Sequence, residues 1–312
     1  MTIPLVPHEQ LAASPQWGTP AEAAAPSPTA VGPESEAKWT SLVASLEAMG
    51  SVLVAFSAGV DSTLLLKAAV DALGRNAVAA TGLSQTYAEE EMADATAIAA
   101  ELGAEHLMVG TMELTDPRYA DNSHQRCFFC KSELYGKLIA TARERGIAVV
   151  VDGANQDDLD DFRPGARAAR QLGVRSPLQE VGLTKAEIRA LSAQLGLRTW
   201  DKPAVACLSS RFAYGDPITV EKLAKVAKAE TGLRRLGFRG FRVRHHDTLA
   251  RIELPPDQMS TAIDRREEVV AAVTGAGYRQ VALDLAGYRS GSQNEGLDAR
   301  LQAGGLRRPG AV

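Results

Sequence analysis

The chain has 312 residues, of which 45% are hydrophobic and 23% charged, so it is long enough to bury the cores of two modest globular domains. A net charge of −4 and a pI of about 5.8 exclude a global basic field and argue against a nucleic-acid substrate. No apolar run approaches the ~20 residues that cross a bilayer, and the N-terminal residues lack the basic start and apolar run of a secretory signal, so we expect a cytoplasmic protein that does not enter a membrane.

The first part of the chain alternates between predicted strands and helices. Residues 1–35 are rich in Ala and Pro and predict a disordered extension, after which Ser35 is a suitable N-cap for a helix to about Met49. Short apolar segments predict strands at 52–56, 77–82, 105–110 and 147–151, and helical periodicity predicts helices at 61–73, 88–102, 131–145 and 184–195. Strands that are apolar on both faces and alternate with helices indicate an α/β fold over 36–212, with a parallel sheet between two layers of helices.

The hydrophobic pattern changes after Tyr214 and Gly215. A helix at about 217–236, strands at 241–246 and 249–254, a helix at 256–274 and a strand at 278–285 are predicted. These elements suggest a smaller α+β domain at 213–290. The Gly- and Arg-rich residues 291–312 predict a flexible tail.

The turn after the first predicted strand is the most informative stretch of the chain. It consists of Ser57, Ala58, Gly59, Val60, Asp61 and Ser62 and leads directly into a helix. A strand, a short turn and a helix start gather unpaired backbone N–H groups and a positive helix end around an anion. The turn lacks the Gly-x-x-x-x-Gly-Lys-[Ser/Thr] pattern that binds the β- and γ-phosphates of nucleotides. Taken alone, an ordinary turn with a capping Ser or Asp explains it about equally well.

The chain has three cysteines, Cys127, Cys130 and Cys207. The first two form a Cys-x-x-Cys step just before the helix predicted at 131–145, a pattern found in zinc sites, redox pairs and buried cores alike. If the three cysteines converge, structural zinc would need a fourth ligand such as His124. A [4Fe–4S] cluster on three cysteines would instead leave one iron open, which a sulfur-transfer reaction can use.

Several motifs in a fixed order point to a known family. The turn resembles the PP-loop, Ser-Gly-Gly-x-Asp-Ser, of ATP pyrophosphatases, in which a glycine usually takes the place of Ala58. The other motifs are Arg126-Cys-Phe-Phe-Cys-Lys131, Asp152-Gly-Ala-Asn155, Asp160-Asp-Phe-Arg-Pro-Gly165, Ala206-Cys-Leu-Ser-Ser-Arg-Phe212, Arg242-Val-Arg244, Ala250-Arg-Ile-Glu253 and Leu283-Asp-Leu-Ala-Gly-Tyr-Arg-Ser-Gly291. Together they resemble the LarE family of ATP-dependent sulfur transferases over roughly residues 36–292.

The resemblance implies a Rossmann-like PP-loop fold of the adenine nucleotide alpha-hydrolase type, and a defined reaction. ATP adenylylates each carboxylate of pyridinium-3,5-biscarboxylic acid mononucleotide, sulfur replaces it, and the product leads to the nickel-pincer nucleotide cofactor. The implied cofactors are ATP on residues 57–62, Mg²⁺ with Asp61 as a candidate ligand, and a [4Fe–4S] cluster on the three cysteines. Ala206 takes the place of the cysteine that single-cysteine relatives sacrifice, which argues against self-sacrifice. The resemblance also implies a homo-oligomer, a hexamer, and leaves the sulfide donor open.

A substrate with one phosphate and two carboxylates requires several cationic side chains. The candidates are Arg211, Arg242, Arg244 and Arg289, with Ser209 and Ser210 as hydroxyl donors and Glu230 at a family position near a substrate-side metal. Arg242 and Arg244 lie two residues apart on a predicted strand and therefore share one face. Without the resemblance, we would expect the strand face with Arg242 and Arg244 to be solvated. We would likewise expect Glu230 to lie on the exposed surface of a helix. His245 and His246 point opposite ways on the same strand, so we expect one packed and one exposed.

Three other functions use some of these features. Thiolation of a tRNA base is known among PP-loop enzymes with three cysteines, but the chain lacks a basic surface or extra zinc-binding segments. An amidating ligase would need a glutaminase or ammonia-channel domain. A non-catalytic nucleotide-binding module with a zinc-stapled loop is the third alternative.

Overall fold

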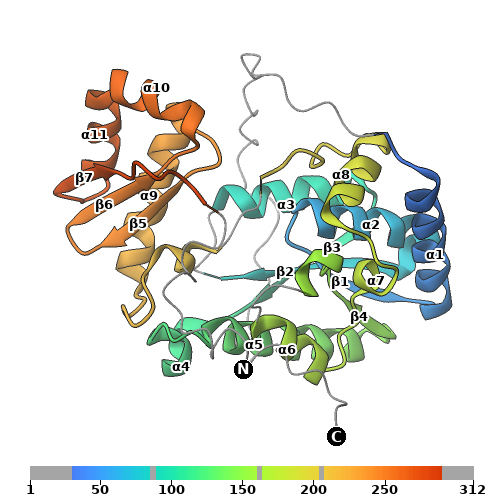
Figure 1. Cartoon of the computed structure of the whole chain (residues 1–312). Helices are drawn as coiled ribbons and strands as arrows, with labels where there is room; N and C mark the ends of the chain where they lie inside the picture. The colour runs from blue at the N-terminus through green and yellow to red at the C-terminus, as the bar shows by residue number, and fades with distance from the viewer. Residues whose placement is uncertain (1–29, 85–88, 160–163, 204–206, 290–312) are drawn as a thin grey trace, which may run out of the picture.

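The computed structural model describes residues 30–84, 89–159, 164–203 and 207–289, which form two sheets with their helices. Figure 1 shows a larger part around the four-stranded sheet and a smaller part around the three-stranded sheet. The predicted N-terminal extension and C-terminal tail fall largely outside the described residues, as do Asp160 to Arg163 and Ala206. Within the described residues, no helix is long and apolar enough to cross a membrane.

The larger sheet is parallel, as the alternation of apolar strands and helices predicts. Its strands are β1 (Val52–Ala55), β2 (Ala77–Leu83), β3 (Glu105–Gly110) and β4 (Val149–Val151), in the order β3-β2-β1-β4. β1 pairs with β2 on one side and with β4 on the other, and β2 also pairs with β3. All three pairings are parallel. The carboxyl ends of the four strands therefore meet at one edge of the sheet, where ligands bind in α/β folds.

Helices cover both faces of this sheet because successive strand side chains point to opposite sides. Val52 and Val54 pack with α1 (Pro33–Met49), α2 (Val60–Leu73), α3 (Glu89–Glu101), α7 (Pro177–Glu180) and α8 (Lys185–Gln194). Leu53 packs on the other face with α5 (Arg126–Glu144) and α6 (Pro164–Gln171). Figure 1 shows the two helix layers on either side of the strands. The α/β prediction is confirmed.

Helix boundaries differ from the prediction where packing or local backbone chemistry decides. α1 begins at Pro33 rather than near Ser35, since proline fits the first turn of a helix. α5 begins at Arg126 rather than at 131, so the prediction of the cysteine pair in a preceding loop was wrong. Phe129 and Cys130 pack against the core of the smaller part, and such tertiary packing can override the weak helix propensity of Phe and Cys.

The smaller sheet contains β5 (Arg242–His246), β6 (Leu249–Glu253) and β7 (Gln280–Leu283). β5 and β6 are antiparallel, whereas β6 and β7 are parallel. One face packs on α9 (Val220–Arg235), α10 (Met259–Asp264) and α11 (Arg266–Thr274), through a core that includes Val243, Ile252 and Val273. The single helix predicted at 256–274 is broken at Arg265, whose guanidinium donates to the carbonyl of Leu236 at 2.7 Å.

The segment before α5 is attached to the smaller part of the molecule. Tyr119, from the short helix α4 (Pro117–Ala120), lies in the hydrophobic core beneath the smaller sheet. Asn122 is fully buried with φ of 54°, and its Nδ2 donates to the carbonyls of Ala213 (2.7 Å) and Asp216 (3.0 Å). Asn122 therefore links residues 213–216, which lead into the smaller part, to the segment just before the cysteine pair.

Replacing Asn122 by Gly is expected to lower the free energy of unfolding by about 2 kcal/mol, because two buried carbonyls lose their donor. Asn122→Ala should cost about 1 kcal/mol more, because alanine disfavours a positive φ. Urea unfolding measures both values. Asp247→Gly is the matched control, since Asp247 also has a positive φ of 49° but is exposed. A cost below about 0.5 kcal/mol for Asn122→Gly would contradict the assigned role.

Candidate functional site

The turn at residues 57–62 lies at the carboxyl end of β1 and forms the start of α2. The hydroxyls of Ser57 and Ser62 lie 3.1 Å apart, and the Ser62 hydroxyl donates to the Gly59 carbonyl at 3.3 Å. Within the described part of the chain, no side chain caps this end of α2. The N–H groups of its first turn are therefore free to bind an anion, helped by the positive end of the helix dipole.

The loop after β4 closes against this turn. A Cβ atom on Gly153 would lie 3.0 Å from the backbone nitrogen of Ser62, so only glycine allows this approach without a shift. Asp152, just before it, is buried and accepts hydrogen bonds from Tyr135 and Ser176, each at 2.7 Å. These contacts hold the motif at 152–155 beside the proposed anion site.

Ala58 adopts the left-handed conformation that normally favours glycine. Its φ is 54° and it is 1% exposed. Replacing the family glycine by alanine would cost nothing only if φ were negative at this position. The positive φ shows that the replacement does have a cost. The conformation costs roughly 1–2 kcal/mol for a residue with a Cβ atom. The Ala58 carbonyl accepts a hydrogen bond from Lys202 at 3.0 Å, a partner that the sequence pattern did not single out.

Asp61 is held by residues far away in the sequence. Its Oδ1 accepts from Asn155 at 3.1 Å, and its Oδ2 forms an ion pair with Lys185. The Asp61 carboxylate therefore links the turn to the loop after β4, through Asn155, and to the start of α8, through Lys185. Each oxygen retains a second lone pair, so this geometry is compatible with a Mg²⁺ ligand.

Burial and nearby charges shift the pKa values of the cysteine pair. Although part of Cys127 reaches the surface, burial raises its pKa, and a charge on Cys207 raises it further. Burial also raises the pKa of Cys130, and the next influence is the carboxylate of Glu113, followed by charges that include the other two thiols. Arg126 acts in the opposite direction on Cys127. The three thiols thus influence one another electrostatically, and their convergence on one metal site stays a prediction.

The two cysteine-bearing segments are joined by a buried hydrogen bond. The hydroxyls of Tyr119 and Ser209 lie 2.6 Å apart, and Ser209 is completely buried. Burial raises the pKa of Tyr119, and a charge on Cys207 adds to that effect. Across the described ranges, no three His, Cys, Asp or Glu side chains are arranged to bind a metal ion, and this holds both for the three cysteines and for the set with His124.

Arg211 and Glu230 form a buried, bidentate ion pair. The distances are 2.8 Å from Nε to Oε1 and 2.9 Å from Nη2 to Oε2, and the two side chains are each 3% exposed. The backbone N–H of Val243 adds a hydrogen bond to Glu230 at 3.1 Å. Burial alone would raise the pKa of Glu230, but these partners hold it below its ordinary value of 4.5. The sequence-based expectation of an exposed Glu230 was wrong, because a partner 19 residues away buries it.

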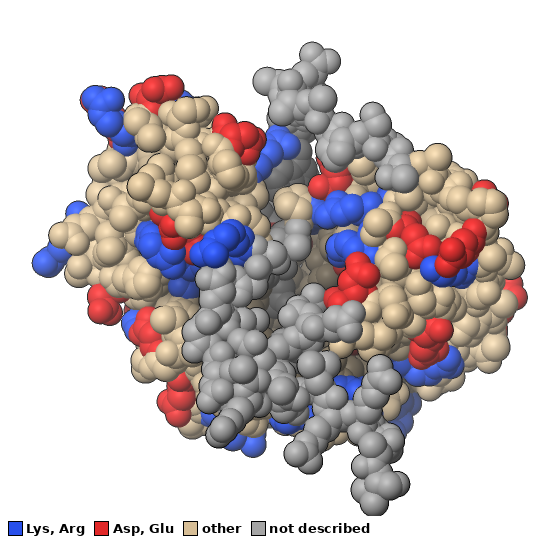
Figure 2. All heavy atoms as spheres, viewed as in Figure 1, with Lys and Arg blue, Asp and Glu red and all other residues tan. Residues whose placement is uncertain are grey.

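Arg242 and Arg244 share one face of β5, opposite the buried Val243, as their spacing predicts. This face is covered rather than solvated. The Arg242 guanidinium lies over the Tyr288 ring, and its pKa is lowered by burial and by the nearby charge of Arg211. Arg244 donates to the Ser210 carbonyl at 2.7 Å and pairs with Glu253 at 2.8 Å. Figure 2 shows Lys and Arg side chains gathered on the part that carries β5, on the side toward the larger part.

The remaining predicted residues differ in exposure. Arg289 is exposed, and Ser210 is half-buried with its hydroxyl 2.9 Å from Arg211. Of the histidine pair, His245 is packed and His246 is exposed, as predicted. The structure therefore brings Arg211, Arg242 and Arg244 together near Cys207.

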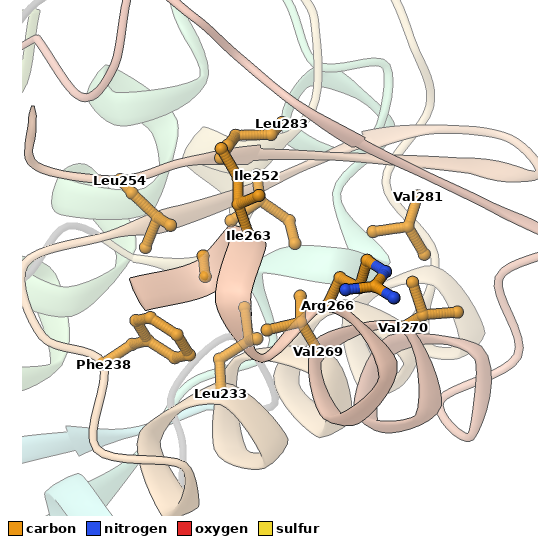
Figure 3. Close-up of a pocket in the computed structure, with 11 residues that line it drawn as sticks. Leu233, Phe238, Ile252, Leu254, Ile263, Arg266, Val269, Val270, Val281 and Leu283 are labelled. Atoms are coloured by element: carbon orange, nitrogen blue, oxygen red, sulfur yellow. The ribbon is translucent and has the colours of Figure 1, made fainter. Parts of the chain in front are cut away.

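An apolar cavity of about 250 Å³ lies on the helix-covered face of the smaller sheet, opposite the face that carries Arg242 and Arg244. Its walls include Leu233, Phe238, Ile252 and Val269, and Arg266 is its charged lining residue (Figure 3). An anionic nucleotide requires several charged partners, so this cavity does not suit one. The arginine face and the PP-loop turn are the better candidate site.

Comparison with known proteins gives a family match and three similar relatives. Residues 34–159 match the NAD synthase family. An uncharacterized protein of Synechocystis is 50% identical over 247 residues, which cover 78% of this chain and 92% of the relative. The pyridinium-3,5-bisthiocarboxylic acid mononucleotide synthase of Lactiplantibacillus plantarum is 41% identical over 261 residues, covering 83% of this chain and 95% of that enzyme. An uncharacterized protein of Methanocaldococcus jannaschii is 32% identical over 169 residues, 54% of this chain and 66% of the relative.

Removing one partner of the buried ion pair should be far more costly than removing both. Arg211→Met is expected to lower the free energy of unfolding by about 3–5 kcal/mol, because the Glu230 carboxylate stays buried without its main partner. The double variant Arg211→Met, Glu230→Met should recover most of that loss. Because the pKa of Glu230 is depressed, the pair's contribution is present above about pH 4.5 and is lost as the pH falls further.

Urea unfolding at pH 7 and at pH 4 measures these differences. Arg145→Met is the matched control, because the Arg145–Glu105 pair has a distance of 2.6 Å but is largely exposed. Its loss should cost less than about 1 kcal/mol. Equal costs for the buried and exposed pairs would contradict the assignment.

Proposed function

Because the chain belongs to the LarE family of PP-loop proteins, we propose that it is an ATP-dependent sulfurtransferase that acts on pyridinium-3,5-biscarboxylic acid mononucleotide. The reaction converts both carboxylates of the substrate to thiocarboxylates. The relative from Lactiplantibacillus plantarum is named for the corresponding bisthiocarboxylic acid. The observation that supports the sulfur-transfer part is the buried 2.6 Å hydrogen bond between Tyr119 and Ser209, which joins the segment before Cys127 and Cys130 to the segment that follows Cys207.

ATP is needed because a carboxylate is a poor electrophile whose leaving group would be oxide. Attack of a carboxylate oxygen on the α-phosphorus of ATP breaks the bond to pyrophosphate and forms an acyl adenylate. The N–H groups of residues 59–62 and the hydroxyls of Ser57 and Ser62 would bind the departing pyrophosphate. Mg²⁺ would neutralise the phosphate charge, with Asp61 as its candidate protein ligand.

The second half of each cycle replaces AMP by sulfur. Attack of a sulfide on the acyl carbon breaks the bond to AMP and leaves a thiocarboxylate. Cys127 and Cys130 lie near the start of α5, where Arg126 opposes part of the rise that burial causes in the pKa of Cys127. Together with Cys207 they would supply three thiolates, the donor set that a [4Fe–4S] cluster with one open iron needs, after the side chains move together and lose their protons. When bound, this cluster supplies an iron that holds external sulfide for transfer.

The arginine face would bind the substrate. Arg242 and Arg244 are positioned by Tyr288, Ser210 and Glu253, so their guanidinium planes are fixed before an anion arrives. Arg289 and the Ser210 hydroxyl would complete the set. Arg211 is neutralised by Glu230 and donates to the Cys207 carbonyl, so it would fix the segment that follows Cys207. Ser209 is buried against Tyr119, so we assign it a positioning role.

Incubation with ATP, Mg²⁺, sulfide and the dicarboxylate nucleotide tests the proposal directly. The expected products are AMP, pyrophosphate and the thiocarboxylate, and formation of ADP would contradict the PP-loop assignment. Anaerobic purification with quantification of iron and labile sulfide tests the cluster. Stoichiometric zinc in place of iron would overturn that part and favour a zinc-stapled module.

Single substitutions Cys127→Ala, Cys130→Ala and Cys207→Ala should abolish sulfur transfer while substrate adenylylation stays within about threefold of the wild type. Adenylylation depends on residues 57–62 and on the arginines, whereas sulfur transfer needs all three thiolates. Release of pyrophosphate in single-turnover assays measures the first step, and mass spectrometry of the product measures the second. Loss of adenylylation in all three variants would show that the cysteines are structural.

Arg244→Ala should weaken substrate binding by about 10- to 100-fold, a loss typical of a charge-assisted contact, and leave ATP binding unchanged. Titration calorimetry with each ligand separates the two affinities. Arg145→Ala, at a remote exposed ion pair, should change neither. Equal weakening of both ligands by Arg244→Ala would contradict its place in the substrate site.

A further inference from the structure

Lys202 connects the turn at Ala58 to helices α3 and α8 of the larger part. Its Nζ donates to the Ala58 carbonyl at 3.0 Å across 144 positions of sequence. The same ammonium group pairs with Asp94 of α3, whose side chain is only 9% exposed. The Lys202 carbonyl in turn accepts from Arg189 of α8 at 2.9 Å. Both ends of this lysine are therefore fixed.

Asp94 is itself held in place. Its other carboxylate oxygen pairs with Arg198 at 2.8 Å, and Arg198 also contacts Glu101 at 3.1 Å. A mostly buried carboxylate with two cationic partners keeps its orientation better than an exposed one does. The Lys202 ammonium group is thereby directed at the Ala58 peptide.

The hydrogen bond fixes more than one carbonyl. A trans peptide group is planar, and its C=O and following N–H point in opposite directions. When Lys202 holds the Ala58 carbonyl, it also sets the direction of the Gly59 N–H, which is one of the donors of the proposed anion site. A relaxed alanine would leave the left-handed region and turn this peptide away.

We propose that Lys202 is a positioning residue for ATP binding: it holds the strained Ala58 peptide so that the N–H groups at the start of α2 converge on the phosphates. The inference rests on the proposed ATP site at residues 57–62. It explains how this chain retains a PP-loop conformation with alanine where the loop pattern has glycine. Glycine at position 58 would adopt the same φ without strain and would depend less on the lysine.

A double-mutant cycle tests this assignment. The ATP dissociation constant is measured by titration calorimetry with Mg²⁺ and without acceptor substrate, for the wild type, Lys202→Met, Ala58→Gly and the double variant. Lys202→Met should weaken ATP binding by about 10- to 100-fold, and Ala58→Gly alone should change it by less than about threefold. In the double variant, the loss caused by Lys202→Met should shrink by about three- to tenfold.

The alternative outcomes are distinct. If Lys202 acts only by touching a phosphate, the effects of the two substitutions multiply, there is no rescue, and the proposal is overturned. Unchanged ATP binding in Lys202→Met overturns it as well. Failure of the wild type to bind ATP refutes the proposed function, and this inference with it.

Two further variants guard against misfolding. Asp94→Asn keeps the ammonium group but removes the ion pair that directs it, and should weaken ATP binding by about three- to tenfold, again with rescue by Ala58→Gly. Lys67→Met removes a lysine from the same helix as the turn, where it pairs with Asp71, and should leave ATP binding unchanged. Loss of ATP binding in Lys67→Met, or no rescue of Asp94→Asn, would overturn the proposal.

Discussion

The left-handed peptide at Ala58 is the constraint on which the larger domain's site depends. It turns the chain sharply between β1 and α2, so that the helix starts directly at the carboxyl end of the sheet. The surrounding structure is arranged to hold this turn. Gly153 lets the β4 loop approach the helix start, Lys185 and Asn155 fix Asp61, and Lys202 holds the strained carbonyl. A conformation that is unfavourable locally persists because several neighbours determine it together.

The second part of the site depends on a balance of buried charges. Several arginines close together would repel one another, and the structure offsets this with acidic partners, Glu230 for Arg211 and Glu253 for Arg244. Such pairs contribute little net stability, because desolvation cancels much of the attraction. Their value here is orientation, since a guanidinium held in place loses less entropy when an anion binds.

The cysteines belong to both parts of the molecule. Cys127 and Cys130 lie at the start of α5, which otherwise packs beneath the larger sheet, whereas Cys130 and Phe129 also contact the core of the smaller part. Tyr119 and Asn122 anchor the same segment to the residues that follow Cys207. The geometry of the three thiols is thus set by how the two parts pack, which fits a reaction in which an activated substrate and a sulfur source must meet.

The sequence by itself determined the features that depend on near neighbours. Apolar periodicity predicted the parallel sheet with helices on both faces, and the motifs indicated the family. Only the tertiary structure showed that α5 starts at Arg126, that Glu230 is buried, and that Lys202 and Lys185 hold the turn. The last two contacts join residues 144 and 124 positions apart. No local pattern encodes such partners, because they meet only when the sheet and its helices have packed.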